Sequence, residues 1–149
     1  MKELEDSVEK NLDQIAADLT PAVINILDKV LNWVFNNIFD GVDIDPKGMQ
    51  AVKDIARKGS LVYVPCHKSH LDYLILSYWL YENWMSVPVV AAGINLAFFP
   101  IGTLLRKGGA FFMKRSFKDN PVYAQTFGAD VRTLLGERIP LECFIEGTR

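Results

Sequence analysis

Hydrophobic residues follow two different patterns along the chain. In the first third they recur every three or four residues with acids between them, at Leu4, Val8, Leu12, Ile15 and Leu19. This spacing predicts an amphipathic helix. Thr20-Pro21 and Asp45-Pro46 each place a capping residue before a proline, which is how many helices begin. Two further helices are therefore expected, one ending near Phe39 and one ending at Lys58.

After Gly59 the pattern changes to short apolar runs that alternate with helical segments. Strands are predicted at 61–65, 87–91, 110–114 and 141–145, and helices at 70–81, 95–106 and from Asn120-Pro121 to near Gly136. Apolar strands separated by helices are typical of a parallel sheet that helices cover. The predicted fold class is α/β, with N-terminal helices followed by alternating strands and helices. We expect a helical region at 1–58 and a second domain that begins at residue 59.

Two apolar segments indicate contact with a membrane surface. Residues 83–105 carry no charge and are long enough to cross a bilayer, but Pro88 and Pro100 interrupt them. A strand followed by a helix resting on the membrane is the better interpretation, because helix 95–106 is bulky, apolar and followed by cations. A core helix with a basic C-terminus would give the same pattern. Helix 21–39 is apolar over more than half its circumference. Lipid, a partner or ordinary core packing would each cover such a surface.

Composition narrows the possible classes of protein. A formal net charge of -2 argues against a nucleic-acid-binding protein that relies on overall charge. Cys66 and Cys143 are too few for a disulfide scaffold, so a reducing cytosolic setting is expected. Both cysteines are interpreted as small apolar packing residues. The acidic N-terminus predicts that no signal peptide is present.

A polar cluster follows the first predicted strand and contains His67 and His70, the only histidines of the chain. If His67 lies in the turn and Asp72 begins the next helix, the carboxylate can hold one ring nitrogen and leave the other as a base. Ser69 and Asp72 also have the spacing of a helix-capping pair, and both interpretations can hold together. A metal site of His67, His70 and Asp72 is a weaker alternative, because no further His or Cys cluster supports it.

Two more polar stretches lie at the ends of predicted strands, Lys114-Arg115 at the end of 110–114 and Glu146 to Arg149 after 141–145. The carboxyl ends of parallel strands share one edge of a sheet. All three stretches are therefore expected to converge. Arg115 and Arg149 can each present a planar fork to phosphate oxygens, and Lys114 adds a point charge. Gly147 would let backbone N–H groups approach an anion closely. Glu146 would orient Arg149 or a substrate hydroxyl, or face solvent.

The three stretches resemble, in order, the motifs of the glycerol-3-phosphate acyltransferases. His67-x4-Asp72, in the setting Pro-Cys-His-Lys-Ser-His-Leu-Asp-Tyr, resembles the first motif, and Gly109 to Arg115 and Phe144 to Arg149 resemble the second and third. Lys114 stands where the family often has arginine, which keeps the charge. The most similar branch contains the bacterial membrane enzyme and dihydroxyacetone-phosphate acyltransferase. The family's fourth motif would lie beyond Arg149, so 59–149 is expected to be an incomplete acyltransferase domain.

The resemblance implies transfer of a fatty acyl group from acyl-CoA or acyl carrier protein to the sn-1 hydroxyl of glycerol 3-phosphate, the first step of phospholipid synthesis. It implies His67 and Asp72 as catalytic residues, and as substrate-binding residues Lys114, Arg115, Glu146, Gly147 and Arg149. No cofactor, metal or nucleic acid is expected. The expected location is the cytoplasmic side of a membrane, as a peripheral or monotopic protein. The alternatives are dihydroxyacetone phosphate or lysophosphatidic acid as acceptor, and an inactive piece that binds a membrane or a partner.

Overall fold

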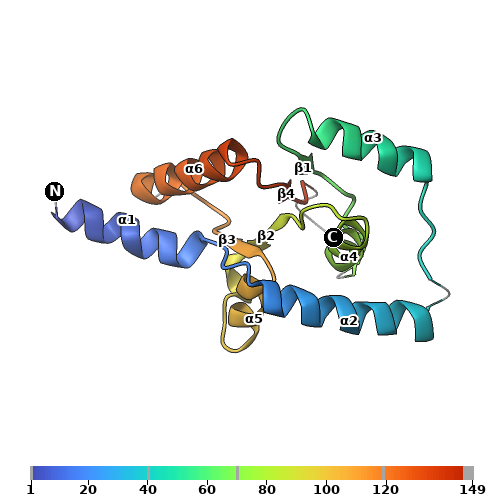
Figure 1. Cartoon of the computed structure of the whole chain (residues 1–149). Helices are drawn as coiled ribbons and strands as arrows, with labels where there is room; N and C mark the ends of the chain where they lie inside the picture. Colours follow the sequence, from blue (N-terminus) through green and yellow to red (C-terminus); the bar gives the residue numbers. More distant parts are fainter. Residues whose placement is uncertain (1, 40, 70, 119, 146–149) are drawn as a thin grey trace.

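The computed structural model describes residues 2–39, 41–69, 71–118 and 120–145. Within these residues, four parallel strands form a sheet in the order β1-β4-β2-β3 (Figure 1). The strands are β1 at Val62–Tyr63, β2 at Val89–Gly93, β3 at Ala110–Met113 and β4 at Leu141–Glu142. The predicted α/β class with a parallel sheet is confirmed. β4 comes last in sequence but lies between β1 and β2, where Glu142 is aligned with both Tyr63 and Val90.

Proline-led turns begin three of the helices, as predicted. The helices are α1 at Lys2–Ile15, α2 at Pro21–Asn37, α3 at Pro46–Ala56, α4 at Asp72–Glu82, α5 at Ile101–Lys107 and α6 at Pro121–Gly136. The Asp45 carboxylate accepts hydrogen bonds from the first two free N–H groups of α3. The Asn120 side chain accepts one from the backbone N–H of Tyr123 at 2.9 Å. Thr20 stands before α2 without a capping bond from its side chain.

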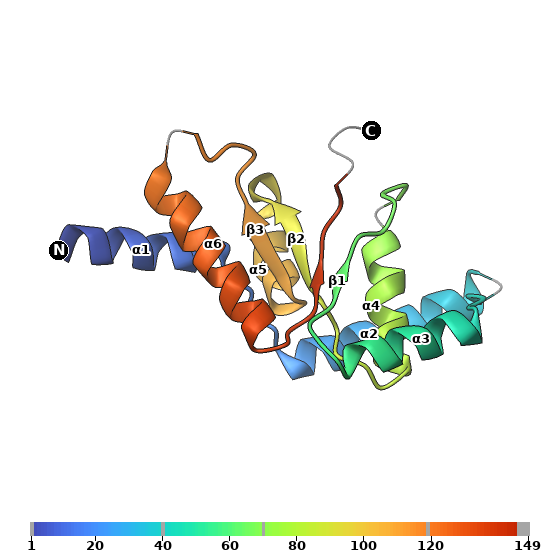
Figure 2. The ribbon, with the colours of Figure 1, turned by 90° about the horizontal axis from the view of Figure 1, so that it is seen from above.

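Two apolar clusters hold the helices in place. Side chains of α6 and the end of α1 pack on one face of the sheet, where the buried residues are Ile15, Val89, Phe111, Tyr123 and Leu141. On the other side of the molecule α4 packs against α2 through Leu31, Phe35 and Tyr78. Figure 2 shows α6 beside β3 and α4 beside β1, at opposite ends of the row of strands. The domain boundary expected at residue 59 stays a prediction.

The helix predicted at 95–106 is wrong. Residues Ile94–Leu96 form a short 3₁₀ turn, and α5 begins only at Ile101. Pro100 explains the break, because proline has no N–H to donate and disfavours helical backbone in the residue before it. Gly102 lets α5 approach the preceding loop, since a Cβ atom there would lie 2.4 Å from the carbonyl carbon of Ala97.

Several predicted ends also shift. The apolar spacing continued to Leu19, but α1 ends at Ile15, where the Arg106 guanidinium donates hydrogen bonds to the carbonyl groups of Gln14 and Ala16. The chain then runs along the end of α5, with the Thr20 N–H donating to the Lys107 carbonyl at 2.9 Å. The third helix ends at Ala56 rather than Lys58. All four strands exist, although β1 and β4 are only two residues long.

The wide apolar surface of α2 divides into two faces. Ile24, Leu31 and Phe35 are buried, whereas Ile26, Val30 and Trp33 are exposed, Trp33 by 60%. Ordinary core packing therefore covers one face and leaves the other open. None of the helices in the described ranges is long and apolar enough to cross a membrane. The uncharged stretch 83–105 instead contains β2, the 3₁₀ turn and the start of α5.

Candidate active site

The turn after β1 is held closed by the carboxylate of Asp72. Its Oδ2 accepts hydrogen bonds from the backbone N–H groups of Lys68 at 2.6 Å and Ser69 at 2.7 Å. The Ser69 hydroxyl oxygen in turn accepts a bond from the Leu71 N–H at 2.9 Å. Asp72 therefore bonds back to Ser69 as the capping interpretation expected, but Ser69 is not the N-cap, because α4 begins at Asp72 and Leu71 precedes it. Since Asp72 is the first residue of α4, the helix fixes its position.

His67 lies in this turn, next to Asp72. Its Nδ1 is 3.7 Å from Asp72 Oδ2, and both side chains are about four-fifths buried, with 21% and 22% exposed. That separation exceeds a normal hydrogen bond but allows an ion pair when the imidazole is protonated. Catalytic hydrogen bonds are often long without substrate and tighten in the reacting complex. The arrangement turns Nδ1 toward the carboxylate, which is the geometry predicted for a base that works through Nε2.

The stretch after β4 reaches the same place. The ring of Phe144 lies 4.3 Å from the imidazole of His67, measured between ring centroids. This contact exists because β4 pairs directly with β1, where the Cys143 N–H donates to the Tyr63 carbonyl at 3.0 Å. Phe144, the first residue of the third stretch, therefore lies beside the His67 turn, as expected for neighbouring parallel strands. The predicted site residues Glu146, Gly147 and Arg149, and the alternative His70, lie outside the described residues.

The second stretch lies farther away. β3 and β1 are at opposite edges of the sheet, three strand spacings apart, which is about 14 Å. The structure therefore does not bring Lys114 and Arg115 into contact with His67. The ammonium group of Lys114 rests 4.4 Å from the ring centroid of Tyr123, and its backbone N–H donates to the Tyr123 hydroxyl at 3.1 Å. Arg115 and the neighbouring Lys118 are exposed.

Glu142 is the residue that sequence reasoning missed. It is 0% exposed, and neither carboxylate oxygen receives a hydrogen bond within the described part of the chain. Burial, and next the negative charge of Asp72, raise its pKa from 4.5 to about 8. A signal was available, because Glu142 is the only charged residue in the apolar run 140–145. Phe144 was part of a predicted motif, but its place against His67 could not be read from the sequence.

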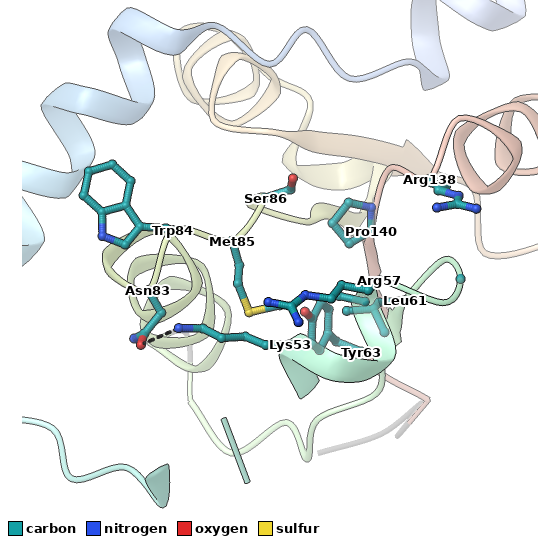
Figure 3. A pocket seen from close by; sticks show the side chains of 12 residues that line it. Lys53, Arg57, Leu61, Tyr63, Asn83, Trp84, Met85, Ser86, Arg138 and Pro140 are labelled. Atoms are coloured by element: carbon teal, nitrogen blue, oxygen red, sulfur yellow. Dashed lines mark hydrogen bonds between the residues drawn. The ribbon is translucent and has the colours of Figure 1, made fainter. Parts of the chain in front are cut away.

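A separate cavity opens at the other ends of the strands. It has a volume of about 460 Å³ and is lined by Lys53, Arg57 and Arg138 together with Tyr63 and neutral residues (Figure 3). Leu61 and Pro140, which precede β1 and β4, also line it, so it lies away from the His67 turn. Arg57 is paired with Asp54 at 3.8 Å, with both side chains largely exposed.

Two other candidate features, the cysteines and a metal site, have less support. Cys66 and Cys143 are both free cysteines, the first exposed and the second partly buried. Cys66 is therefore not the packing residue that was predicted. Within the ranges described above, no group of three His, Cys, Asp or Glu side chains could hold a metal ion. The metal alternative included His70, so the structure does not test it.

Most of the sequence matches a known protein family. The family model described as Acyltransferase matches residues 47–149, so the chain belongs to the acyltransferase family. Among relatives, it is 48% identical over 137 residues to the glycerol-3-phosphate acyltransferase of Ectopseudomonas mendocina. It is 46% and 47% identical over the same length to the proteins of that name from Pseudomonas fluorescens SBW25 and Pseudomonas putida GB-1. The aligned part covers 92% of this chain but only 16% of each relative. The family resemblance is confirmed.

Proposed function

We propose that the full-length protein transfers a fatty acyl group from an acyl thioester to the sn-1 hydroxyl of glycerol 3-phosphate, the first step of phospholipid synthesis. The observation that carries this is the His67–Asp72 pair at the carboxyl end of β1, packed against Phe144 of the third motif. The relatives named glycerol-3-phosphate acyltransferase support the choice of acceptor. The acyl donor is acyl-CoA or acylated acyl carrier protein, and no cofactor takes part.

The reaction needs a base rather than a covalent enzyme intermediate. His67 Nε2 takes the proton of the acceptor hydroxyl while its oxygen attacks the thioester carbonyl. When the tetrahedral intermediate collapses, the C–S bond breaks and the imidazolium returns the proton to the leaving thiolate. Asp72 stabilises the imidazolium between these two steps. The N–H groups of Lys68 and Ser69 are occupied by Asp72, so the donors that stabilise the oxyanion lie elsewhere.

The phosphate of the acceptor is the ligand we propose for Lys114, Arg115 and Arg149, with Gly147 and Glu146 beside them. Arg115 is exposed at the end of β3 and can turn toward a ligand, whereas Lys114 is already held on the Tyr123 ring. Arginine binds phosphate through two parallel hydrogen bonds, which gives direction as well as charge. A small acceptor lying along the strand ends would place its phosphate toward β3 and its hydroxyl toward His67.

The test of the reaction is His67→Ala in the full-length protein. Removal of a positioned base is expected to lower acyl transfer by roughly 10²–10⁴-fold. His70→Ala is the matched control and should cost much less, because His70 lacks the spacing to Asp72. A loss at His70 equal to or larger than that at His67 would refute the assignment. Competition among glycerol 3-phosphate, dihydroxyacetone phosphate and lysophosphatidic acid identifies the acceptor. If none of the three is acylated, the alternative of a protein that only binds a membrane or a partner is favoured.

We also propose peripheral association with the cytoplasmic face of a membrane. The residues that support it lie on the loop before α5 and on α5 itself, where Phe98, Phe99, Ile101 and Leu104 are exposed, Phe99 by 85%. Large exposed apolar side chains beside the cations Arg106 and Lys107 suit an interface. Arg106 also bonds to the end of α1, so Lys107 is the freer of the two to meet lipid.

Flotation of the full-length protein with anionic liposomes tests this association. Phe98→Asp combined with Phe99→Asp is expected to reduce the floating fraction. Ile55→Asp, at an exposed apolar position on α3, is the control and should leave flotation unchanged. If the double substitution floats like the wild-type protein, the segment before α5 is not the contact.

A further inference from the structure

Glu142 is a buried acid at the end of β4. It ends β4 between β1 and β2, is 0% exposed, and neither of its oxygens is hydrogen-bonded within the described ranges. Its aligned neighbours are Tyr63 on β1 and Val90 on β2. The Tyr63 hydroxyl is buried without a hydrogen bond in the same part of the structure, and its ring lines the cavity of Figure 3.

The backbone places Glu142 near the His67–Asp72 pair. Side chains two residues apart on an extended chain share a face, so Glu142 and Phe144 point the same way. The Phe144 ring contacts the His67 imidazole at 4.3 Å. On the other flank, Asp72 at the start of α4 is the charged group close enough to act on the Glu142 carboxyl. Among the described residues, the titratable groups that act on Glu142 are therefore Asp72 on α4 and Tyr63 on β1, and His67 lies next to Asp72.

Two neighbouring carboxyl groups, one fully buried and one largely buried, cannot both ionise easily, so the local donors decide which one carries the charge. Asp72 accepts the N–H groups of Lys68 and Ser69 at 2.6 and 2.7 Å, which stabilise its ionised form. Glu142 accepts none within the described chain, and desolvation favours its neutral form. The proton therefore belongs on Glu142 and the negative charge on Asp72.

We propose that Glu142 is a positioning residue that keeps its proton, so that Asp72 remains the single negative charge beside His67 among the described residues. This inference deepens the proposed acyl transfer and rests on it. A second negative charge in the same space would repel Asp72 from its two N–H donors and favour the protonated imidazole, which cannot act as a base. The neutral carboxyl also fills buried space, which a small side chain would leave empty.

Infrared difference spectroscopy tests the protonation state without relying on activity. The full-length wild-type protein is compared with Glu142→Gln at pH 6.5 and at pH 9.5. We expect a carbonyl band of a protonated carboxylic acid in the wild-type protein at the lower pH, absent from Glu142→Gln and lost at the higher pH. Glu137→Gln, at an exposed position after α6, is the control and should keep the band. If the wild-type protein shows only carboxylate bands at pH 6.5, Glu142 is ionised and the proposal is wrong.

Kinetics of the same variants test the positioning role. Glu142→Gln should keep kcat within about threefold and leave the acid limb of the kcat/KM profile in place, because one neutral group replaces another. Above pH 8 the wild-type rate should fall below that of the variant. Glu142→Ala should lower kcat by roughly 10- to 100-fold with KM nearly unchanged, the scale of a small misplacement of a catalytic group. An acid limb moved to lower pH in Glu142→Gln, or equal losses in the two variants, would overturn the proposal.

The two proposals fail separately. If none of the three acceptors is acylated but the infrared band is present, the acyl-transfer assignment fails and the protonated Glu142 stands. If acyl transfer is observed and Glu142→Gln moves the acid limb, the reaction stands and the role of Glu142 fails.

Discussion

Replacing Glu142 by glutamine is expected to remove a pH dependence of stability from the region around β4. The wild-type carboxyl has its pKa raised from 4.5 to about 8, first by burial and then by Asp72. Between these two values the native protein holds a proton that the unfolded chain has released. Stability therefore falls as pH rises through this window and levels off above it. Glutamine cannot ionise, so the variant lacks this contribution.

The size of the effect follows from the displacement of the pKa. One pH unit corresponds to about 1.4 kcal/mol, so a rise from 4.5 to about 8 corresponds to at most about 5 kcal/mol. Glutamine brings its own cost, because its amide N–H groups are also buried without acceptors. That cost does not depend on pH. The diagnostic quantity is therefore the pH slope of the difference between variant and wild-type protein, rather than its value at one pH.

Hydrogen–deuterium exchange of the peptide that covers β4 measures this slope in the full-length protein. Variant and wild type are compared at the same pH, so the intrinsic exchange rate cancels and the ratio gives the difference in opening free energy. From pH 5 to pH 8.5 the opening free energy of Glu142→Gln should rise relative to that of the wild-type protein by several kcal/mol. Glu137→Gln should show no such growth. Parallel curves for Glu142→Gln and the wild-type protein would refute the buried neutral acid.

Two further outcomes are expected. Arg115→Ala should raise the KM for glycerol 3-phosphate by roughly 10- to 150-fold, the cost of one charge-assisted hydrogen bond, and leave that for the thioester nearly unchanged. If the thioester is weakened instead, Arg115 binds the donor. Gly102→Ala should destabilise the protein by about 1–3 kcal/mol, because its Cβ would meet the Ala97 backbone at 2.4 Å. Gly136→Ala, with nothing within 4 Å, is the matched control, and equal midpoints of thermal unfolding would contradict the packing argument.

The alternation of strands and helices was predictable because each signal was local. Asp45 and Asn120 before prolines fixed the starts of α3 and α6, and the structure shows both side chains capping those helices. The apolar runs gave four strands, and the connecting helices made them parallel. Convergence of His67 with the third motif followed from this topology, since the strand ends share one edge.

The errors arose where a distant contact overrides the local pattern or where a proline interrupts it. Apolar spacing alone continues α1 to Leu19, but Arg106, far along the chain, binds the carbonyl groups at its end. The 95–106 segment is apolar enough for one helix, yet Pro100 interrupts it and Gly102 packs against the preceding loop. The separation of Lys114 from His67 depended on strand order, which the sequence does not reveal.

The candidate site was predicted by residue type but not by environment. His67 and Asp72 were found from their spacing, because a turn followed by a helix brings such residues together. Glu142 was missed, since its importance comes from burial and from its neighbour Asp72 rather than from any motif. Phe144 was recognised only as part of a motif, because its contact with His67 requires that β4 lie beside β1.

The place of β4 in the sheet has a consequence for the order of folding. β1 pairs with β4 alone among the described strands, and β4 is made long after β1 and β2. Until β4 enters between them, β1 and the facing edge of β2 keep unpaired backbone groups, a liability for association with other chains. Pairings between such distant segments form slowly because a long loop must close first. We therefore expect the sheet to be completed, and the histidine turn supported, only after β4 has been made, with the edges of β1 and β2 open to association until then.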